Sequence, residues 1–377
     1  MACATFCLPA FAGTGAAGAA VPRHLIGMNV DGVTLAPEID VGYHLRAIRE
    51  AGAGSVRWSI DWAAIQPYRS WDEVPDERRR DFTDVDGAPM DFRATDRFVG
   101  VAAQVRLRLL PVINTAAPWA SENPYLAFAP PADSAAFGRF AGVLAKRYGS
   151  KGDFWARHPE LPRLPLRAWQ IWNEPAGLSG FDTPSEFWQS ERDPLPAYIE
   201  MLKAARAGLL DADPRAQVVL SGLFGKSWIS LDQLYAAGAR PLFDVVAIHP
   251  YTRYPRNVVR IVRYARKVMA RWGDARKPLV LTEVSWPSDG RPDLSAFSVT
   301  RAEQARLLAR TYKVLLRARA RYRLKGVYWY TWMSIDRYAV RWTDYAGIVT
   351  PVGGRRFSRK PAYFAFRKMA RRLTRAG

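Results

Sequence analysis

Residues 166–175 have the sequence Leu-Arg-Ala-Trp-Gln-Ile-Trp-Asn-Glu-Pro, an apolar stretch that ends in a carboxylate. The short, largely apolar segment Leu166–Trp172 predicts a buried β-strand. Glu174 follows it at once, where a buried charge is costly unless its surroundings stabilise or use it. The segment Leu279–Thr282 repeats this design and is followed by Glu283. The two glutamates therefore suggest one site assembled from strands that are distant in the sequence.

Two carboxyl groups in one cleft are the machinery that glycosidic bond cleavage requires. One group protonates the leaving oxygen, and the other attacks or stabilises the sugar carbon. The sequence thus points to a carbohydrate-cleaving enzyme as its first functional hypothesis.

Eight apolar, β-rich segments alternate with amphipathic helical patterns along the chain. The predicted strands are His24–Val30, Ser55–Ile60, Arg106–Ile113, Leu166–Trp172, Gln217–Leu223, Phe243–Ile248, Pro278–Thr282 and Gly326–Thr331. The predicted helices include Val41–Ala51, Ala135–Tyr148, Pro196–Leu210, Val258–Trp272, Arg301–Arg321 and a last one at Tyr363–Arg372. Eight such repeats predict an α/β fold, a (β/α)8 TIM barrel formed as a single domain over residues 24–377.

Four long connections follow predicted strands, at the end where barrels of this kind build their active sites. They are Asp61–Asp91, Asn114–Asp133, Ala176–Pro194 and Met333–Lys360. Long loops in a compact domain are usually functional or disordered. We interpret them as walls of a saccharide groove, with plain surface variation as the alternative.

Asn173-Glu174-Pro175 on the fourth strand and Thr282-Glu283 on the seventh resemble the retaining glycoside hydrolases of clan A. The overall pattern is nearest to glycoside hydrolase family 39 or family 5 relatives. That resemblance implies that Glu174 is the general acid/base and Glu283 the nucleophile. Since a nearby negative charge favours the neutral form of a carboxyl group, Glu283 is expected to raise the pKa of Glu174.

Further residues match positions that the clan uses around its glutamates. Arg57 on the second strand matches the clan's arginine and is expected to pair with a carboxylate, either Glu283 or a structural partner such as Asp31 or Asp61. The resemblance implies that Asn173 binds a sugar 2-hydroxyl group. It also implies that His249 and Tyr251, at the end of the sixth strand, lie beside the glutamates.

Aromatic residues near strand ends are candidate platforms for sugar rings. The clan places a tryptophan at the end of the eighth strand, which favours Trp332 here, although Trp329 competes because a one-residue register shift exchanges the two faces of a strand. Trp119 and Trp286 are further candidates. The stretch from Tyr345 to Lys360 resembles a hairpin that families 5 and 39 place before the last helix.

The net charge of +20 is concentrated in residues 251–377, which hold 30 Lys and Arg against 7 Asp and Glu. Such asymmetry can attract nucleic acid, anionic lipid or an acidic polysaccharide. The competing interpretation is solvated helix faces in an arginine-rich composition. The alternative function is therefore a non-catalytic carbohydrate- or polyanion-binding barrel that uses this basic third. The expected partner is a carbohydrate, possibly anionic, without specific binding to nucleic acid, and the oligomeric state stays open.

The remaining motifs are sparse. The only two cysteines are Cys3 and Cys7, and the four histidines are scattered, so we expect no metal site and no cofactor. Residues 1–23 are either a flexible segment or a secretory signal, because Ala2–Ala20 is small and weakly apolar although no basic residue precedes Arg23. Export is the expected localisation. No stretch approaches the roughly 20 apolar residues of a transmembrane helix.

Overall fold

The computed structural model describes residues 20–31, 35, 39–177, 179–183, 185–288, 297–335, 341–352 and 356–375. Most of the segment for which a secretory signal or flexible tail was expected, residues 1–23, lies outside these ranges. Among the described helices, none has both the length and the apolar character that crossing a membrane requires.

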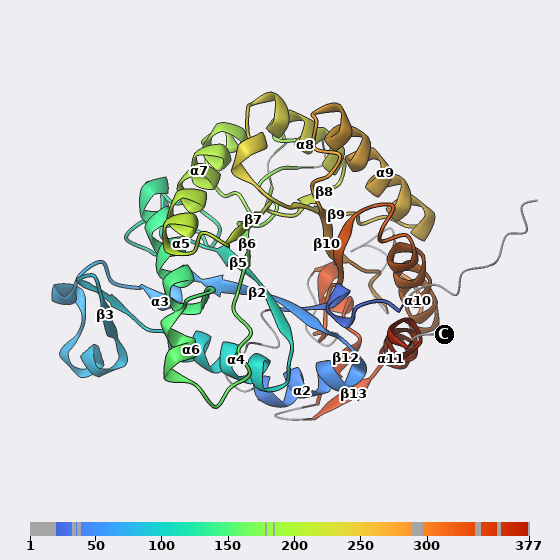
Figure 1. Cartoon of the computed structure of the whole chain (residues 1–377), viewed down its shortest axis with the longest axis horizontal. Coiled ribbons are helices and arrows are strands. Elements are labelled where there is room, and N and C mark those ends of the chain that lie inside the picture. The colour runs from blue at the N-terminus through green and yellow to red at the C-terminus, as the bar shows by residue number, and fades with distance from the viewer. Residues whose placement is uncertain are drawn as a thin grey trace, which may run out of the picture.

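A ring of parallel strands forms the centre of the molecule, with helices around it (Figure 1). The strands follow the order β7-β6-β5-β2-β1-β11-β10-β9-β8. Their bounds are β1 Ile26–Val30, β2 Ser55–Asp61, β5 Arg108–Asn114, β6 Ala168–Ile171, β7 Gln217–Val219, β8 Leu223–Phe224, β9 Val246–His249, β10 Leu279–Val284 and β11 Leu324–Trp329. The predicted α/β barrel is confirmed.

The predicted fifth strand is split into β7 and β8, and this split joins the two ends of the sheet. β7 pairs with β6, β8 pairs with β9, and Val219 forms a parallel bridge with Val245. Gly222 lies between the two pieces with a φ of 77°, a left-handed conformation that glycine adopts without a steric penalty.

Eight longer helices surround the ring among the described residues (Figure 1). They are α2 Val41–Ala51, α4 Arg93–Gln104, α5 Ser134–Tyr148, α7 Pro194–Ala212, α8 Ser227–Ala236, α9 Pro255–Arg271, α10 Arg301–Arg317 and α11 Pro361–Thr374. Side-chain caps mark several starts, as in the capping box that Thr300 and Glu303 form at α10. This helix ends at Arg317, four residues earlier than the sequence predicts, because a turn leads into β11.

Shorter elements occupy the connections. They are α3 Trp62–Ile65, α6 Asp153–Arg157, η1 Arg23–Leu25, η2 Trp71–Glu73, η3 Asp76–Asp81, η4 Arg240–Leu242, η5 Trp342–Tyr345, and the strands β3 Thr83–Val85, β4 Ala88–Met90, β12 Val349–Pro351 and β13 Phe357–Arg359. β12 and β13 pair as the antiparallel hairpin that the sequence resemblance predicts before the last helix. Gly353 and Gly354 lie outside the described residues.

Alternation along the strands separates two apolar regions. A large cluster fills the space between strands and helices, and a small one of Leu110, Val219, Val245, Ala247, Val280 and Tyr328 is contributed by five barrel strands or their approaches. Tyr328 lies against Gly27, where an added Cβ would come within 2.3 Å of its ring. On β11, therefore, Tyr328 belongs to the small cluster, whereas its neighbours Val327 and Trp329 belong to the outer one.

Candidate active site

Glu174 and Glu283 meet at the carboxyl end of the barrel. One carboxylate oxygen from each and a ring nitrogen of His249 all lie within 4.8 Å of one another. Glu174 follows β6, and Glu283 is the penultimate residue of β10. Both glutamates are largely buried, since Glu174 is 9% exposed and Glu283 is 6% exposed. The structure thus brings together the two carboxylates that the sequence predicted to share a site.

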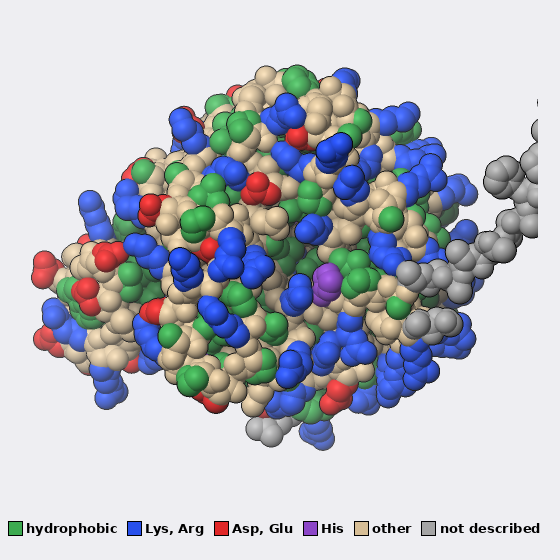
Figure 2. Space-filling model, viewed as in Figure 1, with side chains coloured by type: hydrophobic (Ala, Val, Ile, Leu, Met, Phe, Trp, Pro, Cys, Tyr) green, Lys and Arg blue, Asp and Glu red, His purple; other side chains and the backbone are tan. Residues whose placement is uncertain are grey.

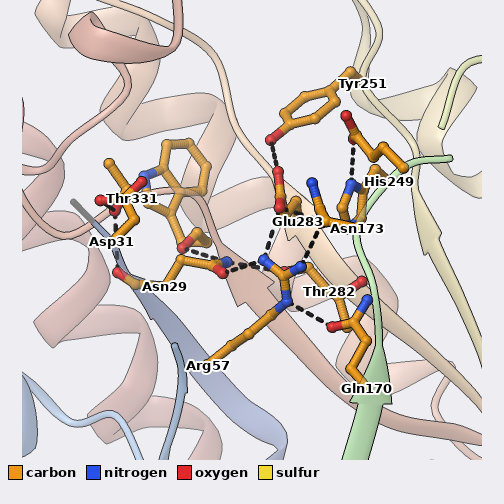
Figure 3. Close-up of polar contacts among 12 residues, drawn as sticks. Asn29, Asp31, Arg57, Gln170, Asn173, His249, Tyr251, Thr282, Glu283 and Thr331 are labelled. Carbon is orange, nitrogen blue, oxygen red and sulfur yellow. Dashed lines mark hydrogen bonds and ion pairs between the residues drawn. The ribbon is translucent and has the colours of Figure 1, made fainter. Parts of the chain in front are cut away.

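Arg57 on β2 is the hub of the polar network beneath the glutamates (Figure 3). Its Nη1 donates to Glu283 Oε1 at 2.7 Å and to Asn29 Oδ1 at 2.8 Å. Its Nη2 donates to Asn173 Oδ1 and its Nε to Gln170 Oε1, both at 2.7 Å. The guanidinium group therefore fixes residues from three further strands or their ends, and its carboxylate partner is Glu283 rather than Asp31 or Asp61.

His249 and Tyr251 supply the other contacts of the glutamates (Figure 3). Nδ1 of His249 contacts Glu174 Oε1, and its Nε2 lies 3.6 Å from Glu283 Oε1. The hydroxyl group of Tyr251 donates to Glu283 Oε2 at 2.5 Å. Each carboxylate thus has its own set of partners, and His249 lies between the two.

The surroundings make the two carboxyl groups unequal. Burial raises the pKa of Glu174 well above its usual range, and the negative charge of Glu283 raises it further. Burial also raises the pKa of Glu283, but the charge of Arg57 and the hydrogen bonds from Tyr251 and Arg57 oppose that rise. The pair therefore holds its first proton on Glu174. Burial, reinforced by Arg57, lowers the pKa of His249 well below its usual range, so its ring is neutral.

The backbone at the end of β6 is unusual. Trp172 and Glu174 have φ values of 63° and 41°, in the left-handed region that residues with a Cβ rarely adopt. Such conformations cost free energy and concentrate at functional sites. Here the two left-handed residues change the direction of the chain directly after β6, where Glu174 is located.

A metal ion would find three potential ligand atoms in this site, because Glu174, His249 and Glu283 could each offer one. However, Arg57 already places a positive charge 2.7 Å from Glu283 Oε1. A cation bound there would face that charge. The expectation that the protein uses no metal or other cofactor stays a prediction.

The tryptophans chosen as sugar platforms lie elsewhere. Trp332 and Trp286 have no exposed surface. Trp332 donates to His44 Nδ1 and packs against Phe357 and Tyr363, and Trp286 donates to the carbonyl oxygen of Arg253. The predictions for both are wrong in this structure, since a buried ring has no free face for a sugar. The competitor Trp329 is fully buried as well.

Trp119 is partly exposed but is not among the residues around the glutamates. Its indole nitrogen donates to the carbonyl oxygen of Gln66 at 3.0 Å, and its ring packs edge-on against Trp62. It lines a hollow shared with α5, α7 and the β3–β4 hairpin. The structure therefore does not bring Trp119 to the site.

Five site residues were not predicted from the sequence to lie beside the glutamates. Asn29 on β1 accepts from Arg57 and donates to the carbonyl oxygen of Thr282 at 2.8 Å, and Gln170 on β6 accepts from Arg57. Both are polar residues inside apolar strands, a signal that could have revealed them. The other three are the partly exposed Asp31, Tyr330 and Trp342.

These three residues lie beside the nucleophile candidate. Asp31 accepts a hydrogen bond from Thr331 Oγ1 at 3.0 Å and contacts Tyr330, and burial raises its pKa. Trp342 packs edge-on against Tyr251, with ring centroids 4.9 Å apart. Tyr330, the first residue after β11, lies near Asp31 and Glu283.

Solved structures share this fold across nearly the whole chain. A family 39 glycoside hydrolase from Bacteroides cellulosilyticus WH2 matches with a TM-score of 0.62 at 20% identity, covering 93% of this chain and 64% of that one. A glucosidase from Croceicoccus marinus matches with a TM-score of 0.66 at 17% identity, covering 94% and 69% of the two chains. A β-xylosidase from Caulobacter crescentus CB15 has a TM-score of 0.63 at 16% identity, with coverages of 93% and 69%.

The match to these glycosidases shows a common fold. The chain spans less than two thirds of the Bacteroides relative's length. No protein-family model matches the sequence, and no curated protein does. The activity of this chain therefore has to be argued from its own site.

Proposed function

We propose that this protein is a retaining O-glycoside hydrolase in which Glu174 is the acid/base and Glu283 is the nucleophile. The observation that carries the proposal is the approach of the two carboxylates, which have one oxygen each within 4.8 Å of one another. Retaining enzymes hold their carboxyl groups about 5–5.5 Å apart, whereas inverting enzymes leave about 6.5–9.5 Å for a water molecule. The glycosidase fold of the structural neighbours adds support.

In the first step a Glu283 carboxylate oxygen attacks the anomeric carbon while the bond from that carbon to the leaving oxygen breaks. Glu174 gives its proton to the leaving oxygen, so the aglycone departs as an alcohol. In the second step water attacks the anomeric carbon, Glu174 takes the proton, and the ester bond to Glu283 breaks. The sugar is released with its original configuration.

The contacts of the two glutamates suit these unequal roles. Arg57 and Tyr251 each donate to a different oxygen of Glu283, which stabilises its negative charge. Glu174 contacts His249 through Oε1, and among the described residues no hydrogen bond engages its Oε2. A neutral His249 that donates from Nδ1 leaves Oε2 of Glu174 to carry the proton for the leaving group.

Substrate contacts follow from the partly exposed residues of the site. We assign Tyr330, Asp31 and Trp342 to the wall beside the nucleophile, and Asn173 to the sugar 2-hydroxyl group. Arg57 Nη2 donates to Asn173 Oδ1, which leaves the Asn173 amide nitrogen to donate elsewhere. The substrate is a polysaccharide or a smaller glycoside.

The test is a screen of nitrophenyl glycosides with different sugars and both anomeric configurations. For any sugar that is cleaved, proton NMR of the first product reports its anomeric configuration before mutarotation. Product with the substrate's configuration supports the proposal. Product with the opposite configuration would contradict it. Failure to cleave any glycoside, with retained binding of oligosaccharides, would instead favour the non-catalytic barrel.

A further inference from the structure

A basic hollow lies at the opposite end of the barrel from the glutamates. Its volume is about 610 Å³, and its lining includes Arg276, Arg319, Arg323 and Lys325. These residues come just before β10, just before β11 or at its beginning, whereas Glu283 lies near the end of β10. The hollow is therefore formed by connections from helices to strands and takes no part in the proposed chemistry.

More cations extend this surface. Arg23 precedes β1 and Arg108 begins β5, the neighbour of β2 in the sheet, and both are exposed. Burial lowers the pKa of His24, and the positive charges of Arg108 and Lys325 lower it further. Burial likewise lowers the pKa of Arg266, and the positive charge of Arg323 lowers it further. Cations on different connections are thus close enough to lower the pKa of neighbouring basic groups.

Carboxylates do not neutralise this surface among the residues that the structure describes. Arg23, Arg108, Arg276, Arg323 and Lys325 form no salt bridge there. Nearby acids are already engaged, with Asp244 paired to Arg206 and Asp274 paired to Arg240 and Lys277. On the side of the molecule with α9 to α11, Lys and Arg side chains also crowd the surface with few Asp or Glu between them (Figure 2), and this separate surface supplies the control positions below.

Two arginines of this end also occupy strained backbone positions. Arg106 and Arg323, which precede β5 and β11, have φ values of 58° and 47°. Glycine adopts this left-handed conformation without penalty, and arginine does not. Solvated helix faces, the default interpretation of the charge, do not explain arginines at non-helical positions where the backbone disfavours them.

We propose that this surface, the basic face of Arg23, Arg108, Arg276, Arg323 and Lys325, binds an acidic polysaccharide. Among the described residues, no aromatic ring lines the hollow, so this part of the chain provides no platform on which unpaired nucleic acid bases stack. None of the exposed large apolar side chains of the described residues lines it either, so it lacks the apolar anchor of a membrane-inserting surface. A chain of sugar carboxylates or sulfates needs only the cations and releases counterions on binding.

The basic face lies at the end of the barrel remote from Glu174 and Glu283. An acidic chain held there leaves the active-site end open to other glycan chains. The inference stands independently of the proposed hydrolase activity, because binding at the basic face uses none of the catalytic residues.

The experiment compares binding of polygalacturonate, by isothermal titration calorimetry at several NaCl concentrations, between two variants of equal charge. The test variant carries Arg108→Gln, Arg276→Gln, Arg323→Gln and Lys325→Gln. The matched control carries Arg256→Gln, Arg263→Gln, Arg310→Gln and Lys368→Gln on exposed faces of α9, α10 and α11, where none of the four forms a salt bridge with a described residue. Each variant removes three arginines and one lysine, and thermal melting verifies that both fold.

We expect the test variant to bind polygalacturonate at least tenfold more weakly than the unmodified protein and with a shallower salt dependence. The control should lose less than twofold. Equal losses in the two variants would overturn the proposal, because they would mean that overall charge decides binding. Absence of binding by the unmodified protein would also overturn it. So would equal or tighter binding of duplex DNA or of vesicles containing phosphatidylserine.

Discussion

Gly222 lies directly against the imidazole ring of His249. A Cβ added to Gly222 would stand 2.2 Å from Nε2 of His249, far closer than any van der Waals contact allows. The ring nitrogen on the other side of that imidazole contacts Glu174. The missing side chain of Gly222 therefore determines where His249, and through it the acid/base candidate, is held.

Gly222→Ala should displace His249 and reduce kcat/KM for an activated aryl glycoside by roughly tenfold or more, because positional errors of about 1 Å at catalytic groups cost up to ~100-fold. The control is Gly238→Ala, since Gly238 has a similar φ of 81° against 77° but no atom within 4 Å of an added Cβ. Both variants lose stability through backbone strain, and only Gly222→Ala should lose activity. Equal activities in the two variants would show that His249 does not position Glu174.

Arg57→Lys should keep the positive charge but lose the planar set of donors that reaches Glu283, Asn29, Asn173 and Gln170. A hydrogen bond to a charged group contributes about 1.5–3 kcal/mol, so kcat/KM should fall by roughly 10- to 100-fold. Steady-state kinetics measures the loss. Arg93→Lys, at an exposed surface ion pair, should leave the rate unchanged. A fully active Arg57→Lys enzyme would mean that charge alone matters there.

The pH dependence should reflect the raised pKa of Glu174. The acid form of Glu174 is required, so kcat/KM should fall as pH rises through this pKa, and burial displaces that decline towards higher pH. Glu283→Gln removes the neighbouring negative charge and should lower the pKa of Glu174. Carbon NMR of labelled glutamate carboxyl groups can follow the titration. If the pKa of Glu174 rises or stays constant in Glu283→Gln, the proposed coupling is absent.

Trp332 and Tyr330 should separate stability from substrate binding. Trp332→Ala creates a cavity in the buried core and should cost about 3–5 kcal/mol of unfolding free energy, with little change in KM for the enzyme that stays folded. Tyr330→Ala should instead weaken catalysis, because Tyr330 lies beside Asp31 and Glu283. Chemical denaturation and steady-state kinetics report the two effects. The reverse pattern would restore Trp332 as the sugar platform.

The sequence predicts the barrel and the paired glutamates because both depend on regular alternation of apolar strands and amphipathic helices. It does not predict which aromatic ring near the end of β11 faces the site, because a shift of one residue along a strand moves a side chain to the opposite face of the sheet. On β11, Tyr328 belongs to the small cluster and Trp329 to the outer one, and the chain beyond them carries Trp332 away to His44.

Loop residues lie beyond such periodicity. Trp119 and Trp342 both follow strand ends, but the path of each connection decides that Trp342 contacts Tyr251 while Trp119 packs against Trp62. The polar residues Asn29 and Gln170, in contrast, were visible as exceptions within apolar strands. Their joint partner is Arg57, the one buried cation that the sequence did single out.

The roles of Glu174 and Glu283 are tested most directly by the products that azide gives with two alanine variants. Azide needs no deprotonation, so in Glu174→Ala it should attack the glycosyl-enzyme and yield a glycosyl azide of the substrate's configuration. In Glu283→Ala it should enter the vacated space and yield the opposite configuration. NMR of the products from a dinitrophenyl glycoside distinguishes them. If Glu283→Ala gives the retained azide and Glu174→Ala the inverted one, the two assignments are reversed.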